Sequence, residues 1–170
     1  MKARLGCRGV LETRFPRMWL SLTSDKMKVE ATNQKESEST LFYLIPTGMR
    51  EVCIQHITSK HFIAINHNGK LISKSIYDAD CNFKEGIFAN YWTTYSSLKW
   101  GLDRMQLTTW FMAINGRGNR VSAKITQKSR PSAHFLPDPI EGNLHLRHLR
   151  FNISSFQTFI KGLKPKFDEN

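Results

Sequence analysis

A long interval of this 170-residue sequence contains cations and no carboxylate. No Asp or Glu lies between Asp103 and Asp138. The interval contains six basic residues, which are Arg104, Arg117, Arg120, Lys124, Lys128 and Arg130. A cluster of one sign attracts a polyanion over long range, with arginine binding sulfate or phosphate through two parallel hydrogen bonds and lysine acting as a point charge. The chemistry predicted for this segment is therefore the binding of an anionic polymer.

The charge of the whole chain agrees with such a partner. Lys and Arg number 25 and Asp and Glu number 14, which gives a net charge of +11. This balance predicts nucleic acid, an anionic membrane surface or an acidic polysaccharide as the partner. Nucleic acid is disfavoured because no nucleic-acid motif or aromatic reading surface accompanies the charge. No run of 18 apolar residues occurs, which excludes a membrane-spanning helix and predicts no membrane insertion.

The other reactive residue types form no catalytic or metal-binding pattern. Six histidines show no HExxH or similar ligand spacing, and no GxSxG, P-loop or GxGxxG context is present. Cys7, Cys53 and Cys81 stand far apart without a CxxC pair, which supports neither a disulfide framework nor a zinc site. We therefore expect no enzymatic activity, no cofactor and no metal.

Three similar segments predict the elements that position the basic interval. Met18–Val29, His61–Ile72 and Trp110–Val121 each contain an aromatic residue, an alternating run, a turn and a second alternating run. Alternation is strand periodicity, and Asn68-Gly69 is the strongest short hairpin signal because both residues accept positive φ. Each segment therefore predicts a β-hairpin, and the third hairpin contains part of the basic interval.

A second set of strands is predicted between the hairpins. These strands are Leu41–Pro46, Val52–Ile57, Asn82–Phe88 and Ala133–Pro137, and three of them centre on Phe42, Phe83 and Phe135. About four strands in each of three repeats make about twelve, and closing them removes exposed sheet edges. We therefore expect an all-β fold, a β-trefoil of about twelve strands. Apolar residues at helical spacing in the tail allow a short C-terminal helix.

One run carries a recognisable family pattern. CNFKEGIFANYWTTYSS, from Cys81 to Ser97, closely resembles the Cys-x-Phe-x-Glu…Asn-x-Tyr-x-Thr-Tyr-x-Ser signature of fibroblast growth factors. FIAINHNGKLISKS before it, and WFMAINGRG and AHFLPDP after it, stand in the family's order, so the resemblance runs from about Met18 to Pro139. It implies a β-trefoil growth factor that binds a fibroblast growth factor receptor tyrosine kinase ectodomain together with heparan sulfate. Receptor activation would then control cell migration, proliferation or differentiation.

The family's heparin site coincides with the acid-free interval. The resemblance implies that heparan sulfate binds at Arg117, Arg120, Lys124, Lys128 and Arg130. The family commonly has a Gly-x4-Gly-x2-Ser/Thr pattern here, which lets the backbone approach the sugar. This chain has Gly118 and Thr126 but Ala123 at the second glycine, and the effect on heparin affinity stays open.

The resemblance also implies receptor contacts at Glu85, Asn90, Trp92 and Leu136. Glu85 would accept charge-assisted hydrogen bonds. Trp92 stands where the family usually has Tyr, and a large aromatic can be a hot spot in either form. Asp138 occupies a position where an apolar residue is frequent in the family.

The first strand has two candidate segments. Arg4–Arg8 (RLGCR) has family-like residues but lies a few residues too far from Trp19, whereas Thr13–Arg17 (TRFPR) has the better spacing without the Cys. Neither is preferred by the sequence. The chain is accordingly divided into an N-terminal extension, 1–13, a β-trefoil growth-factor domain, 14–142, and a basic C-terminal tail, 143–170.

The resemblance favours a secreted protein that is monomeric alone. Met1–Thr13 shows no apolar run of the secretory type. Asn152 begins a glycosylation acceptor triplet, which has meaning only for a secreted chain. The alternative is an intracellular trefoil of the same family that binds a sodium channel or another cytosolic partner. A lectin trefoil ranks last because the Gln-x-Trp type of repeat is absent from the sequence.

Overall fold

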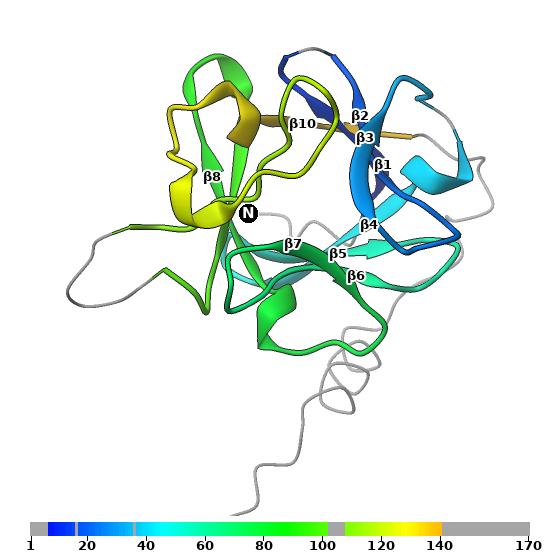
Figure 1. Cartoon of the computed structure of the whole chain (residues 1–170), viewed down its shortest axis with the longest axis horizontal. Coiled ribbons are helices and arrows are strands. Elements are labelled where there is room, and N and C mark those ends of the chain that lie inside the picture. The colour runs from blue at the N-terminus through cyan, green and yellow to red at the C-terminus, as the bar shows by residue number, and fades with distance from the viewer. Residues whose placement is uncertain (1–6, 16, 36, 102–107, 141–170) are drawn as a thin grey trace, which may run out of the picture. The chain divides into compact units, whose positions relative to one another are not determined.

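The computed structural model describes residues 7–15, 17–35, 37–101 and 108–140 (Figure 1). These residues form ten strands, which are β1 (Cys7–Thr13), β2 (Trp19–Leu22), β3 (Val29–Thr32), β4 (Phe42–Gly48), β5 (Glu51–His56), β6 (Phe62–Ile65), β7 (Leu71–Lys74), β8 (Phe83–Ile87), β9 (Thr93–Ser97) and β10 (Phe135–Pro139). The helical segments described are short 3-10 turns, which are η1 (Glu38–Thr40), η2 (Ala79–Cys81), η3 (Ala89–Tyr91), η4 (Ala123–Ile125) and η5 (Pro131–Ala133). The predicted all-β class is confirmed.

The strands pair in one antiparallel sheet with the order β3-β2-β1-β10-β9-β8-β5-β6-β7, and β4 pairs with both β1 and β5. The first two predicted hairpins are β2–β3 and β6–β7. The third, Trp110–Val121, is closed by the bridge between Ile114 and Arg120 and by the Val121 amide, which donates to the Ala113 carbonyl (2.9 Å). Its ladder is too short for named strands, so the described chain has ten strands instead of about twelve.

The core repeats the threefold pattern of the sequence. The central residues of three predicted strands are fully buried, and so is the residue after the aromatic of each hairpin; these six are Phe42, Phe83, Phe135, Leu20, Ile63 and Met112. All six belong to one hydrophobic cluster. Burying each such side chain contributes roughly 1.5–3 kcal/mol relative to exposure. The repeats are therefore three sides of a single core, as a β-trefoil requires.

Hydrogen bonds join the three hairpins to one another. The Ala31 amide of the first donates to the Gly118 carbonyl of the third (2.8 Å). The Ala123 amide, just after the third, donates to the Gly69 carbonyl of the second (2.7 Å). Gly69 and Gly118 have φ of 74° and 78°, which glycine adopts without steric cost. Contacts with both other repeats thus set the position of the third hairpin and its following loop.

The first strand overlaps both candidate segments, since β1 begins in Arg4–Arg8 and ends at the first residue of Thr13–Arg17. β1 ends at Thr13, whose amide donates to the Met18 carbonyl (2.8 Å), and it pairs with β10 and β4. The described part of the expected N-terminal extension is therefore a strand of the sheet. The sequence pattern did not show it because Val10 and Leu11 are both buried, so alternation is lost. Gly9 is required there, since a Cβ would lie 2.6 Å from the Asp138 carbonyl oxygen.

The C-terminal tail, 143–170, lies outside the described residues, as do its expected helix and the acceptor Asn152. Within the described ranges no helix is long and apolar enough to cross a membrane. The sheet and its loops up to Ile140 are therefore where the predicted binding residues can be located.

Candidate functional site

The turn of the third hairpin presents Arg117 on a locally fixed backbone. The Asn115 carboxamide oxygen accepts the amides of Arg117 (2.9 Å) and Asn119 (3.0 Å), and the Asn115 carbonyl accepts the Gly118 amide (2.9 Å). Asparagine and glycine are favoured in turns for these reasons. Arg117 is exposed, whereas Arg120 is half-buried where the hairpin closes.

The loop after the hairpin carries the other three predicted cations. Lys124 lies in η4, Lys128 lies between η4 and η5, and Arg130 precedes η5; all three are exposed. Thr126 is buried between them, and its hydroxyl donates to the Ser122 carbonyl (2.8 Å). The loop is therefore anchored by inward polar contacts while its basic side chains face solvent.

The predicted cations carry uncompensated charge. Among the described residues, none of the five forms an ion pair. The Lys124 ammonium lies over the Trp110 ring, 5.4 Å from its centroid. The amides of Gln127, Lys128 and Ser129 donate no hydrogen bond to any described group. Guanidinium, ammonium and amide donors that form no ion pair or hydrogen bond with a described residue suit the oxygens of a sulfate.

The structure distributes these cations along a path rather than at one point. The Lys128 ammonium lies 3.8 Å from the position that a Cβ on Gly86 of β8 would take. The Lys124 Cγ lies 2.7 Å from the corresponding position on Gly69 in the turn between β6 and β7. Arg120 faces this second hairpin from the third. The predicted site therefore extends from β8 to the second hairpin, a length suited to a chain ligand.

Ala123 does not occupy the exposed face of the loop. It is 2% exposed and belongs to the central hydrophobic cluster. Its methyl group packs inward while its amide holds the Gly69 carbonyl. The residue that departs from the family pattern therefore places no side-chain atom between the loop and a bound sugar.

Replacing Ala123 with glycine is expected to leave heparin affinity unchanged and to lower the free energy of unfolding by about 1 kcal/mol. The loss comes from the buried methyl group and the greater backbone entropy of glycine in the unfolded chain. Urea denaturation measures the stability, and elution from a heparin column measures the affinity. A clear gain in heparin affinity would contradict the inward placement of the methyl group.

His134 connects the basic loop to Arg14, the residue that follows β1. It is fully buried, its Nε2 donates to the Lys128 carbonyl (2.7 Å), and its Nδ1 accepts from the Arg14 guanidinium (2.8 Å). Arginine can only donate, so the imidazole is neutral with its proton on Nε2. Phe88 stacks on the ring at a centroid distance of 4.3 Å. Burial lowers the pKa of His134, and the nearby Arg14 charge lowers it further despite the opposing bond to Lys128.

Acid should destabilise the protein through this histidine. The pKa of His134 is lower in the folded than in the unfolded chain. Its contribution to the free energy of unfolding is therefore complete above the unfolded pKa of about 6.5 and is lost as the pH falls from there through the folded pKa. Burial lowers the pKa of His56 in the same direction. Each histidine adds a slope of at most about 1.4 kcal/mol per pH unit.

The expected result is a smaller decrease in unfolding free energy between pH 7.5 and pH 5 for His134→Gln than for the unmodified chain. Denaturant titrations at several pH values measure it. His67→Gln, which removes an exposed imidazole, is the matched control. Equal decreases for His134→Gln and the unmodified chain would contradict a lowered pKa of His134 in the folded chain.

Two of the predicted receptor contacts adjoin one strand pair. Thr93 of β9 pairs with Phe135 of β10. Trp92 directly precedes Thr93, and Leu136 directly follows Phe135. Leu136 is 37% exposed, and half-buried Trp92 has the Arg14 guanidinium 5.8 Å from its ring centroid. An aromatic and an aliphatic side chain are thus partly exposed next to the same strand pair.

The other two predicted receptor residues lie on the β8–β9 hairpin. Glu85 is half-buried on β8, where its amide donates to the Arg50 carbonyl (2.8 Å). Asn90 lies in η3, the turn between β8 and β9, shortly before Trp92. The Asp138 carboxylate, at the position that is often apolar in the family, pairs with the Lys35 ammonium (2.7 Å).

Sequence reasoning did not single out two exposed apolar residues of the same hairpin. Ile87 and Tyr91 are 68% and 88% exposed, and Tyr91 has a φ of 69°. The signal available was their position in the sequence, with Ile87 at the end of β8 and Tyr91 directly after Asn90 in the short turn η3. Both side chains lie near the predicted contacts Asn90 and Trp92 in the sequence.

The described cysteine thiols belong to the packing rather than to a reactive site. Cys53 and Cys81 are buried in a second hydrophobic cluster. Burial raises the pKa of each thiol to about 12. Such thiols are protonated at neutral pH and unreactive. In the part of the chain that the structure describes, no group of three His, Cys, Asp or Glu residues could hold a metal ion.

Comparison with known proteins agrees with the fold and with the sequence patterns. The family model described as "Fibroblast growth factor" matches residues 14–136. Fibroblast growth factor 7 of Sus scrofa is 34% identical over 119 residues, which are 70% of this chain and 60% of that protein. Fibroblast growth factor 7 of Ovis aries is 33% identical over the same shares of both chains. The chain thus spans 60% of the length of these relatives, and it belongs to the fibroblast growth factor family.

Proposed function

We propose that this growth factor acts outside the cell, as a monomer on its own, by binding and activating a fibroblast growth factor receptor tyrosine kinase with heparan sulfate as co-receptor. The glycan binds along Arg117, Arg120, Lys124, Lys128 and Arg130. The receptor ectodomain binds a surface containing Glu85, Asn90, Trp92 and Leu136. Receptor pairing then controls migration, proliferation or differentiation of the cell. The protein itself catalyses no reaction in this scheme.

The observation that carries the proposal is the anchored, acid-free loop whose cations form no ion pair with a described residue. Four of the five cations are exposed, and none has an ion-pair partner among the described residues. Maintaining like charges close together costs free energy in the isolated protein, and a polyanion removes that cost. The names of the two relatives, both growth factors, support the same function.

A receptor phosphorylation assay tests the proposal. The purified protein is added to cells that display a fibroblast growth factor receptor and lack heparan sulfate, with and without added heparin. We expect receptor phosphorylation that depends on heparin. The absence of phosphorylation under both conditions would reject the receptor function and favour an intracellular partner instead.

A further inference from the structure

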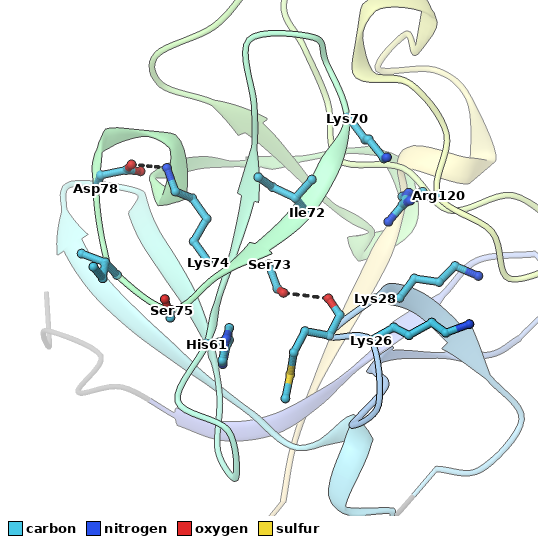
Figure 2. A pocket seen from close by; sticks show the side chains of 12 residues that line it. Lys26, Lys28, His61, Lys70, Ile72, Ser73, Lys74, Ser75, Asp78 and Arg120 are labelled. Carbon is cyan, nitrogen blue, oxygen red and sulfur yellow. Dashed lines mark hydrogen bonds and ion pairs between the residues drawn. The ribbon is translucent and has the colours of Figure 1, made fainter.

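A second basic surface lies outside the acid-free interval. A cavity of about 890 Å³ opens between the turn of the β2–β3 hairpin and strand β7 (Figure 2). Its cationic lining consists of Lys26, Lys28, Lys70, Lys74 and Arg120. Asp78 is the one carboxylate among its described lining residues. The cavity is large enough for a charged sugar unit and is strongly biased toward anions.

The charges of this cavity are unevenly compensated. Lys74 pairs with Asp78 and Asp80, and Lys28 pairs with Glu30 (2.9 Å). Figure 2 shows Lys74 turned toward Asp78 on one side, while Lys26, Lys28, Lys70 and Arg120 gather on the other. Within the described chain, Lys26, Lys70 and Arg120 have no ion-pair partner. The open side of the cavity is therefore a cationic rim.

A hydrogen bond joins two of the hairpins that carry this rim. The Ser73 hydroxyl donates to the Met27 carbonyl (2.7 Å), which ties the second hairpin to the turn of the first. Met27 adopts a φ of 43°, a conformation that a non-glycine residue keeps only when its surroundings enforce it. The two hairpins that carry the cations are thus tied together before any ligand arrives, which lowers the entropy cost of binding.

The rim is continuous with the proposed glycan loop. Arg120 belongs to both, because it pairs with Ile114 in the third hairpin and lines the cavity. The backbone nitrogen of Lys124 lies 3.2 Å from where a Cβ on Gly69 would be, and Gly69 is followed directly by Lys70. A chain ligand bound at Lys124 can therefore reach Lys70 without leaving the cationic surface.

We propose that the cavity binds sulfate groups of the same heparan sulfate chain, so that the glycan extends past Arg120 to Lys70 and Lys26. This inference rests on the proposed glycan-binding function and adds a second segment to it. Short oligosaccharides occupy the loop alone, whereas longer ones occupy the loop and the cavity together. Chain length, rather than sulfation alone, then determines affinity.

Heparin fragments of two lengths test the extension. Lys26→Gln/Lys70→Gln should weaken binding of a dodecasaccharide about tenfold at physiological salt and reduce its salt dependence, because fewer counterions are released. Binding of a tetrasaccharide should stay unchanged. The matched control is Arg50→Gln/Lys84→Gln, which removes two exposed cations outside both surfaces and should leave dodecasaccharide affinity near that of the unmodified protein.

Acetylation of lysines on the unmodified protein, followed by mass spectrometry, locates the glycan directly. Bound dodecasaccharide should protect Lys26 and Lys70 together with Lys124 and Lys128, and should leave Lys84 reactive. Protection of Lys124 and Lys128 alone would overturn the cavity inference while the proposed function stands. Protection of none of these lysines, with no measurable heparin binding, would reject the proposed glycan function itself. Protection of Lys26 and Lys70 only by vesicles that contain phosphoinositides would assign the cavity to a lipid headgroup and overturn the inference.

Discussion

Replacing Arg117, Lys124, Lys128 and Arg130 together with glutamine is expected to move elution from a heparin column to much lower salt. Each exposed cation contributes on the order of 0.5–1 kcal/mol to binding of a polyanion, so four predict a loss of affinity between about thirtyfold and a thousandfold. The four side chains are exposed and lack ion-pair partners among the described residues, so their removal leaves no buried charge uncompensated.

Stability and salt dependence separate this result from general damage. The variant should unfold at the same urea concentration as the unmodified chain, because the loop is anchored by Thr126, Ala123 and His134 instead. The dependence of log affinity on log salt should become shallower, because fewer cations remain to displace counterions from the glycan. Unchanged elution would refute the loop as a glycan site. Binding that ignores salt would indicate a lectin-like trefoil that reads sugars without charge.

Replacing Trp92 with alanine is expected to reduce receptor phosphorylation by at least about tenfold at limiting protein concentration. Half-buried aromatics at the centre of an interface commonly contribute about 2 kcal/mol or more. Half-buried Trp92 and exposed Leu136 both adjoin the Thr93–Phe135 pair, and we expect them to contribute to one partly apolar contact surface. Leu136→Ala should act in the same direction with a smaller effect, because it removes less surface.

Three comparisons make the receptor experiment specific. Trp92→Tyr, which restores the residue usual in the family, should retain most of the activity. Met49→Ala truncates an apolar side chain that is 84% exposed on the β4–β5 turn and should leave phosphorylation unchanged. Heparin elution of Trp92→Ala should match that of the unmodified protein. Equal losses for Met49→Ala and Trp92→Ala would disprove a localised receptor surface.

The sequence by itself determined the elements that local patterns encode. Alternation and the Asn68-Gly69 turn identified the second hairpin at nearly its observed bounds, Phe62–Ile65 and Leu71–Lys74. Phe42, Phe83 and Phe135 were expected at strand centres; each is instead the first residue of its strand, and all three are fully buried. The acid-free interval and the family signature could be recognised from the order of residues along the chain alone. Such features depend on side-chain periodicity and turn chemistry, which act over a few residues.

Only the tertiary structure decided how distant segments meet. β1 is a strand because β10 and β4 pair with it, although Val10 and Leu11 are buried in succession and hide the pattern. Ala123 faces the core because its amide is held by Gly69 in another repeat.

The cationic cavity combines Lys26, Lys70 and Arg120, one from each hairpin. No local pattern relates these three residues. Their proximity follows from packing three hairpins on one core and joining them by hydrogen bonds between repeats, which are long-range interactions that periodicity within a segment does not encode.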